Sequence, residues 1–358
     1  MNNNLGVFLG NRNEVAIFKW ADLWNCELLM VEPGSVSTIP IEGQREPRFL
    51  SACPNGIYLA FWSFTGESFR LIDITGNHLW SAWMNSDKCV PIYIKFSASG
   101  DAAACFYHFD GVPGVFFCDI RQGFSTTFGC CGSPVGHDGD LRYFALSSLD
   151  RYEYNELPFY EADTVSGRIS KLSLETAMEK IKNGPVILDR NRCIVAQPAI
   201  LKGGWEGLAI QPDNTGYVIQ RAGDVSWFAA DSEKPEVTFK DCLRESERNR
   251  DYCKIMSLSG DNALIQIHEK SIVVNRHHGV TWRGDKQVST RLKGNRVLAQ
   301  YEDDTVEVIN DDGSIEVKYP PPPQGFPIAA DIVDDVLYVA QVGSKYEVLT
   351  FTLSKKSE

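Results

Sequence analysis

Residues 94–104 read Ile-Lys-Phe-Ser-Ala-Ser-Gly-Asp-Ala-Ala-Ala, an apolar run, a tight polar turn and a second apolar run. Short apolar runs that alternate with period two, separated by residues that favour turns, are typical of paired β-strands. Residues 49–60 and 255–265 have the same pattern, and weaker copies have turns near Asn13, Gly139, Asn214, Gly294 and Asp334. The sequence therefore predicts a β-hairpin that recurs along the chain.

A second kind of unit follows the first, and it consists of an apolar strand, a polar hairpin and another strand. Copies cover residues 69–80, 116–124, 159–169 and 308–315, with Asp-Gly or Ser-Gly pairs that tolerate positive φ at several of the turns. One unit of each kind makes four antiparallel strands in about 40 residues, which is the repeat length of a propeller blade. In this pattern the chain resembles the WD40-like β-propeller superfamily, although it has no Trp-Asp dipeptide and Gly-His occurs once, at Gly136-His137.

The expected fold is all-β, a β-propeller of four-stranded antiparallel blades that forms a single domain over residues 1–358. Counting turns favours eight blades, with seven as the alternative. Residues 173–210 fit no blade well and are expected to be an insertion or an irregular blade, with a short helix around 173–184 that Ser173 caps. The last copy, residues 338–353, lacks a clear fourth strand, and residues 5–9 are a candidate to supply it because ring closure removes sheet edges.

Charge and cysteine content restrict the partners and the compartment. Lys and Arg number 35 against 47 Asp and Glu, a net charge of -12, which disfavours nucleic acid and anionic membranes and favours a basic protein partner. No apolar run approaches the roughly 18 residues of a membrane-spanning helix, and the N-terminus does not resemble a secretion signal. Several of the ten cysteines lie in apolar strand-like runs and none form a CxxC pair, so we expect a reduced, cytoplasmic protein.

Motifs of catalysis are absent from the sequence. It contains no Gly-x-Ser-x-Gly, no His-Glu-x-x-His and no phosphate-binding Gly-x-x-x-x-Gly-Lys. His137, Asp138, Asp140 and the pair His277-His278 are expected at the turns of one face, where a metal site is the alternative to ordinary turn chemistry. We therefore predict no catalytic residue, no cofactor and no metal ligand.

Aromatic and acidic residues gather in the connections between the second and third strands of the first four blades. In the later blades the same connections are short and polar, as at residues 221–224. Exposed rings beside carboxylates are typical of protein-binding surfaces, and the carboxylates would attract a basic partner. The predicted partner-binding residues are Trp20, Asp22, Trp24, Trp62, Phe64, Glu67, His108, Phe109, Asp110, Tyr152, Glu153 and Tyr154. For Phe61, Trp62 and Tyr107 the alternative is that they end strands and pack between blades.

These observations favour a non-enzymatic propeller that binds another protein, with an inhibitor or immunity-type protein that neutralises its partner as a specific form. An enzyme, a hydrolase or lyase acting at the central channel, is the alternative from a different class. A third interpretation is a carbohydrate- or small-molecule-binding propeller that uses the loop aromatics as stacking platforms.

Overall fold

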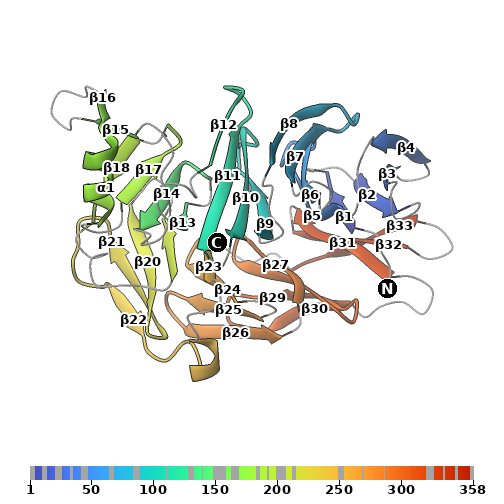
Figure 1. Ribbon diagram of the computed structural model, residues 1–358. Helices are drawn as coiled ribbons and strands as arrows, with labels where there is room; N and C mark the ends of the chain where they lie inside the picture. Colours follow the sequence, from blue (N-terminus) through green and yellow to red (C-terminus); the bar gives the residue numbers. More distant parts are fainter. Residues whose placement is uncertain are drawn as a thin grey trace. The chain divides into compact units, whose positions relative to one another are not determined.

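Strands dominate the computed structural model, and they form eight sheets (Figure 1). Among the described residues, six sheets have four strands, one has six and one has three. The all-β propeller architecture with eight blades is therefore confirmed. The structure describes residues 5–9, 14–20, 26–32, 35–41, 47–63, 68–83, 89–109, 112–127, 133–138, 140–147, 159–162, 169–182, 186–191, 193–198, 207–211, 215–248, 254–267, 270–285, 287–319, 326–333, 335–342 and 346–354.

The chain divides into two units, residues 1–107 with 286–358 and residues 108–285. The boundary falls within β10. The strands up to this boundary and after residue 286 are β1 (Leu5–Phe8), β2 (Val15–Trp20), β3 (Cys26–Glu32), β4 (Ser35–Ile41), β5 (Pro47–Ala52), β6 (Tyr58–Ser63), β7 (Ser68–Asp73), β8 (His78–Trp83), β9 (Cys89–Phe96), β10 (Ala102–Phe109), β27 (Gln287–Lys293), β28 (Arg296–Tyr301), β29 (Val306–Ile309), β30 (Ile315–Tyr319), β31 (Phe326–Val333), β32 (Val336–Val342) and β33 (Tyr346–Thr352).

The second unit holds the remaining strands and both described helices. Neither helix is long and apolar enough to cross a membrane, as far as the described residues go. The elements are β11 (Val112–Asp119), β12 (Phe124–Thr127), β13 (Ser133–His137), β14 (Tyr143–Ser147), β15 (Phe159–Ala162), β16 (Ile169–Leu172), α1 (Leu174–Lys182), β17 (Val186–Asp189), β18 (Cys193–Ala196), β19 (Gly207–Ile210), β20 (Gly216–Arg221), β21 (Asp224–Ala229), β22 (Val237–Phe239), the 3-10 helix η3 (Glu245–Glu247), β23 (Lys254–Ser259), β24 (Asn262–Ile267), β25 (Lys270–Asn275) and β26 (Gly279–Asp285).

The predicted hairpins form where the repeats place them. Strands β5–β6, β9–β10 and β23–β24 are neighbours in their sheets, and their turns coincide with the polar turns of the three strongest copies. In the turn after β9, the backbone N–H of Gly100 donates to the carbonyl oxygen of Ser97 at 3.0 Å. A φ of +72° at Gly100 explains why glycine occupies this position.

The core of the first unit lies between the faces of neighbouring sheets. Phe18 of β2 and Phe61 of β6 meet edge to face with ring centroids 4.9 Å apart, and both are fully buried. On its other face the β1–β4 sheet packs against β31–β33, where Ile17 belongs to the same buried cluster as Ala329 and Ala340. Because β2 is covered on both faces, its residues Val15 to Phe18 are all buried and apolar without strict alternation.

The six-stranded sheet, ordered β13-β14-β17-β18-β15-β16, shows how the region around residues 159–198 departs from the repeat. Ser173 caps α1 as expected, since its Oγ accepts a hydrogen bond from the N–H of Thr176 at 3.1 Å. Strands β17 and β18, however, are the third and fourth strands of this blade. The prediction that the hairpin at residues 159–169 forms these two strands is wrong, because β15 of this hairpin pairs with the outer side of β18. The more apolar segment takes the inner position: Val186 to Leu188 are fully buried, whereas Ile169 is 63% exposed.

The candidate assignment of residues 5–9 to the last blade is also wrong. Strand β1 pairs with β2, from Leu5 opposite Phe18 to Phe8 opposite Val15, and is the first strand of its own sheet. The apolar residues Val7 and Phe8 are buried there against two neighbouring sheets. The last sheet, β31-β32-β33, consequently has three strands.

Gly100 offers a test of contacts between neighbouring blades. A Cβ at this position would lie 2.5 Å from Sγ of the buried Cys53, in the corresponding turn of the preceding sheet. We expect Gly100→Ala to lower the free energy of unfolding by about 2 kcal/mol, since it adds this overlap to the cost of a left-handed alanine. Gly294 has a φ of +58°, and an added Cβ would have nothing within 4 Å. Gly294→Ala should therefore lower the free energy of unfolding by only about 1 kcal/mol. Urea denaturation of both variants measures the difference, and equal losses would contradict the contact.

Candidate functional site

Three of the four connections that carry the predicted site join second and third strands, as the repeat requires. Strands β2 and β3 pair up to Trp20 opposite Cys26, and β6 and β7 pair up to Ser63 opposite Ser68. Strands β10 and β11 are likewise neighbours in one sheet. Each of these three connections therefore starts and ends at adjacent points of a hairpin.

Most of the predicted site residues fall outside the described part of the chain. Trp20 lies at the end of β2, and His108 and Phe109 at the end of β10, but the description does not extend to their side chains. The fourth connection, residues 148–158, leads from β14 to β15, which is the fifth strand in the order of its sheet, so the prediction that it joins a second to a third strand is wrong. The residues wholly outside the description are Asp22, Trp24, Phe64, Glu67, Asp110, Tyr152, Glu153 and Tyr154.

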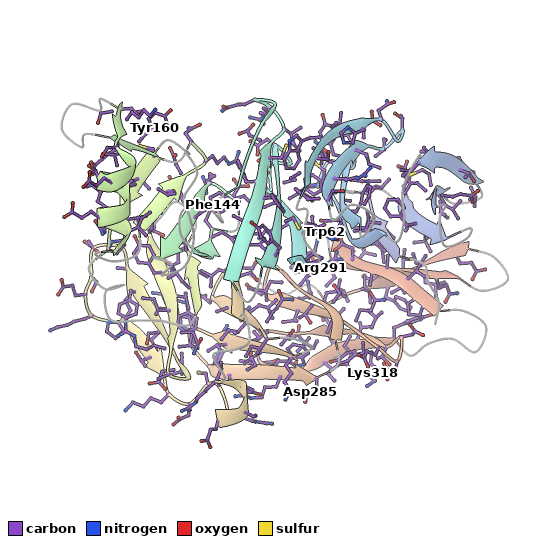
Figure 2. The ribbon with its side chains drawn as sticks, in the orientation of Figure 1. Trp62, Phe144, Tyr160, Asp285, Arg291 and Lys318 are labelled. Atoms are coloured by element: carbon purple, nitrogen blue, oxygen red, sulfur yellow. The ribbon has the colours of Figure 1, made fainter. Side chains whose placement is uncertain are left out.

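Trp62 is buried, so its assignment to the predicted partner-binding residues is wrong. It lies within β6 opposite Phe69 and has no exposed area (Figure 2). Phe61 and Tyr107 are also buried. Phe61 belongs to a cluster that the sheet shares with β1–β4, and the burial of all three residues supports the alternative interpretation that they pack inside the fold.

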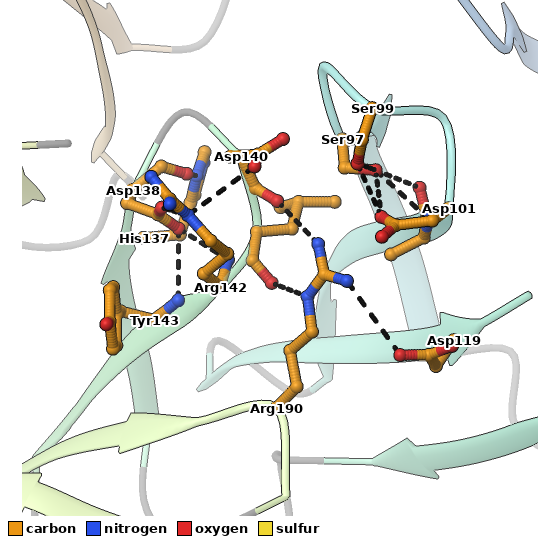
Figure 3. Close-up of polar contacts among 12 residues, drawn as sticks. Ser97, Ser99, Asp101, Asp119, His137, Asp138, Asp140, Arg142, Tyr143 and Arg190 are labelled. Carbon is orange, nitrogen blue, oxygen red and sulfur yellow. Dashed lines mark hydrogen bonds and ion pairs between the residues drawn. The ribbon is translucent and has the colours of Figure 1, made fainter. Parts of the chain in front are cut away.

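At the turn between β13 and β14, the predicted polar residues form a structural network (Figure 3). Asp138 is fully buried, and its Oδ1 accepts hydrogen bonds from the backbone N–H groups of Arg142 and Tyr143 at 2.6 and 3.0 Å. Nε of Arg142 lies 3.3 Å from Oδ2 of Asp138 and 3.4 Å from Oδ2 of Asp140. A hydrogen-bonded carboxylate of this kind closes a turn.

Arg190, which the sequence did not single out, connects this turn to its surroundings. Its Nε donates to the carbonyl oxygen of Leu141 and its Nη2 to that of Asp140, both at 2.9 Å, while Nη1 lies 3.8 Å from Oδ2 of Asp119 (Figure 3). Its guanidinium also lies over the ring of Phe117 at 5.9 Å. Arg190 therefore joins the turns of its own blade to β11 of the preceding blade.

The histidines of this face have different surroundings and do not converge. His137 is buried, with Nδ1 2.6 Å from the carbonyl oxygen of Asp138. The side chain of His277 is 64% exposed and contacts Asp261 at 3.4 Å. Within the described ranges, no three His, Cys, Asp or Glu side chains are grouped as metal ligands would be. The hydrogen bonds described for Asp138, Arg142 and Arg190 thus stabilise the turn between β13 and β14.

The five cysteines whose side chains the structure describes, Cys53, Cys105, Cys118, Cys193 and Cys242, are buried. Burial, with a smaller effect of Asp119, raises the pKa of Cys118 to about 12, and burial raises that of Cys242 to about 11. A thiol with a raised pKa has little thiolate at neutral pH and is a poor nucleophile. Cys118 and Cys242 are therefore unsuited to nucleophilic catalysis.

The short connection of a later blade has the compact geometry predicted for it. Arg221 pairs with Asp224 across a two-residue turn, Ala222-Gly223, in which both residues have positive φ. Arg248, which follows η3, packs on Gly223 and donates to the carbonyl oxygen of Leu243 at 2.9 Å. This turn is covered by the chain's own residues.

Comparison with known proteins identifies the architecture. No known protein family and no curated protein matches the sequence. The C-terminal WD40 domain of Sif2 is 11% identical with a TM-score of 0.52, over 96% of this chain and 94% of that one. The β-propeller domain of Cps50 (Swd1) from Myceliophteria thermophila is 9% identical (TM-score 0.50; 97% and 95% covered), and BamB from Moraxella catarrhalis 12% (0.51; 98% and 95%). The chain therefore has the β-propeller fold that these structures share.

Proposed function

We propose that this propeller is a non-enzymatic protein that binds another protein through the connections of its first four blades. The surface in question, called the loop face below, consists of Trp20, Asp22, Trp24, Phe64, Glu67, His108, Phe109, Asp110, Tyr152, Glu153 and Tyr154. Trp62 is excluded because it is buried.

The observation that carries the proposal is the composition of these connections relative to the strands that hold them. A strand pair needs only a short polar connection, as Ala222-Gly223 demonstrates. The 21–25 and 64–67 connections instead carry Trp24 and Phe64 beyond the last paired residues. Large rings outside a ladder add nothing to strand pairing, whereas aromatic residues supply much of the binding energy at protein interfaces.

A basic partner fits the charge of the chain. The loop face contains four acidic residues, and the whole chain carries a net charge of -12. Acidic residues around aromatic ones speed the approach of a positively charged protein and disfavour acidic competitors. An inhibitor or immunity-type protein that neutralises such a partner is the specific form of this proposal, and a scaffold or adaptor would use the same surface.

Substitution of three loop rings tests the proposal. We expect Trp24→Ala, Phe64→Ala and Tyr152→Ala, combined in one variant, to reduce partner recovery in a pull-down by about tenfold or more, since hot-spot rings contribute most of an interface's affinity. Urea denaturation should show unchanged stability, because the rings lie in connections rather than in the sheets.

A matched control removes exposed apolar residues from fourth strands. Val36 of β4, Leu79 of β8 and Ile315 of β30 are 54%, 45% and 52% exposed. The combined Val36→Ala, Leu79→Ala and Ile315→Ala variant should recover the partner as the wild type does. Equal recovery by the loop variant and the wild type would rule out the loop face as the interface.

A further inference from the structure

Strand β33 occupies an unusual position in its sheet. In the part of the chain that the structure describes, every other sheet has at least four strands, while β31-β32-β33 ends at its third (Figure 1). The third strands of other blades, such as β25 and β29, are almost entirely buried. In β33, Val348, Leu349 and Phe351 are only partly buried, and Thr350 is exposed.

The hydrogen-bond pattern identifies the backbone groups on the outer side of β33. The N–H of Leu353 donates to the carbonyl oxygen of Asp335, its opposite residue, at 2.8 Å. In an antiparallel ladder, hydrogen-bonded and non-hydrogen-bonded pairs alternate. Leu349 and Phe351 therefore bond to β32, whereas the N–H and C=O groups of Val348, Thr350 and Thr352 point away from it.

The outer side of β33 lacks the features that protect sheet edges. Such edges usually carry a proline, several charges, a bulge or a very short strand. The β32–β33 ladder pairs seven consecutive residues, Tyr346 to Thr352, without a register shift, and the strand contains one charge, Glu347, and no proline. By contrast, the ladders of β8, β26 and β30 have register shifts, β4 contains Pro40, and β22 has three residues.

The neighbouring sheets limit what can pair with this edge. Val348 packs on the cluster shared with β1–β4, and Phe351 on the cluster shared with β27–β30, where its ring centroid lies 5.4 Å from that of Tyr319. Both neighbouring sheets have a fourth strand, so they extend one strand further than β33. A single extended segment fits between them more readily than the edge of a second propeller does.

We propose that β33 is a docking site for an extended segment of a partner protein, which adds to the sheet as its antiparallel or parallel fourth strand. Backbone hydrogen bonds to Val348, Thr350 and Thr352 would supply the affinity, as in other cases of strand addition. Side chains of the segment would alternate between the Val348 side and the Leu349–Phe351 side, which favours β-branched or aromatic residues at successive positions. This site is separate from the loop face and does not depend on it.

Residue-resolved hydrogen exchange tests the proposal on the full chain. The probe is a synthetic peptide of residues 313–320, which carries the sequence of β30, the fourth strand of the adjacent sheet. In the free protein, the amides of Val348 and Thr350 should exchange much faster than those of Leu349 and Phe351. With the peptide at about 1 mM, we expect exchange at Val348 and Thr350 to slow by about tenfold and exchange at the other two to stay unchanged.

Two variants separate strand addition from other binding. Thr350→Pro removes an outward N–H without removing a bond to β32, so the fold should persist and the protection should disappear. Thr350→Val keeps the N–H and should behave as the wild type. Three results would overturn the proposal: slow exchange at Val348 and Thr350 in the free protein, no added protection with the peptide, or protection that survives Thr350→Pro. The triple loop-face variant should bind the peptide normally, which keeps this test independent of the proposed function.

Discussion

Replacing Arg296 by methionine is expected to lower the free energy of unfolding by about 3 kcal/mol. The side chain of Arg296, at the start of β28, is 11% exposed and makes three hydrogen bonds. Nε donates to Oε2 of Glu316 at 2.8 Å, Nη1 to Oδ1 of Asp335 at 2.6 Å and Nη2 to the carbonyl oxygen of Ser354 at 2.5 Å. One guanidinium thus joins the β27–β30 sheet to the end of the β32–β33 pair at which β32 begins and β33 ends.

The expected loss of stability in Arg296→Met is large because the acceptors of the guanidinium stay in place when the guanidinium is removed. The side chain of Glu316 is 8% exposed, and its Oε1 also accepts hydrogen bonds from the backbone N–H and the hydroxyl of Ser354. In Arg296→Met this carboxylate keeps the Ser354 bonds but has no cation beside it. An unpaired charge of low exposure costs more than an intact pair contributes, so stability falls more than it would for an exposed ion pair.

Acid denaturation provides a second measurement of the same contact. Burial alone would raise the pKa of Glu316, but hydrogen bonds from Ser354 and Arg296 and the charge of Arg296 lower it below 4.5. A carboxyl with a lowered folded pKa stabilises the protein above its unfolded pKa, and this contribution is lost as the pH falls through the folded value. The wild type should therefore lose more stability than Arg296→Met on acidification through that range.

The control is Glu316→Gln, alone and combined with Arg296→Met. The double variant should be more stable than the sum of the two single losses predicts, because no charge is left unpaired. Urea denaturation at neutral pH measures all four proteins. A loss below about 0.5 kcal/mol for Arg296→Met would show that the network contributes little.

The hairpins could be predicted from sequence because their determinants are local. A polar turn with glycine at positive φ, as at Gly56 and Gly100, between two apolar runs sets both the strand pair and its end. The cap of α1 at Ser173 was predictable for the same reason. Arg296 had no such signal, since its three partners are 20, 39 and 58 residues further along the chain.

Two features depend on burial in the folded protein and could not be predicted from local sequence: the strand order of the β13–β18 sheet and the interior position of Trp62. The strand-hairpin-strand pattern of residues 159–169 is the same as that of a blade unit, yet the fully buried run Val186 to Leu188 takes the third position. Trp62 likewise ends an apolar run beside a polar connection, and only the sheets packed on both sides of β6 show that it is interior. For Trp24 and Phe64 the assignment to the loop face stays a prediction.

The buried carboxylate of Asp138 gives the second large expected effect. Asp138→Ala removes the acceptor of two backbone N–H groups, those of Arg142 and Tyr143, in a turn where Asp138 itself has no exposed area. Each N–H left without an acceptor costs about 1–3 kcal/mol, so we expect a total loss of about 3 kcal/mol. Asp138→Asn keeps one acceptor oxygen and should lose about 1 kcal/mol.

The comparison with Arg142 separates a structural role from a chemical one. Arg142→Ala removes a side chain that is 39% exposed but keeps the backbone N–H that bonds to Asp138. It should lower the free energy of unfolding by less than about 1 kcal/mol. If Asp138 holds the turn, urea denaturation should show the smallest loss of stability for Arg142→Ala, a larger one for Asp138→Asn and the largest for Asp138→Ala. Partner recovery by the folded variants should stay at the wild-type level. If Asp138 were instead a ligand or a catalytic carboxylate, Asp138→Ala would keep its stability and lose binding or activity.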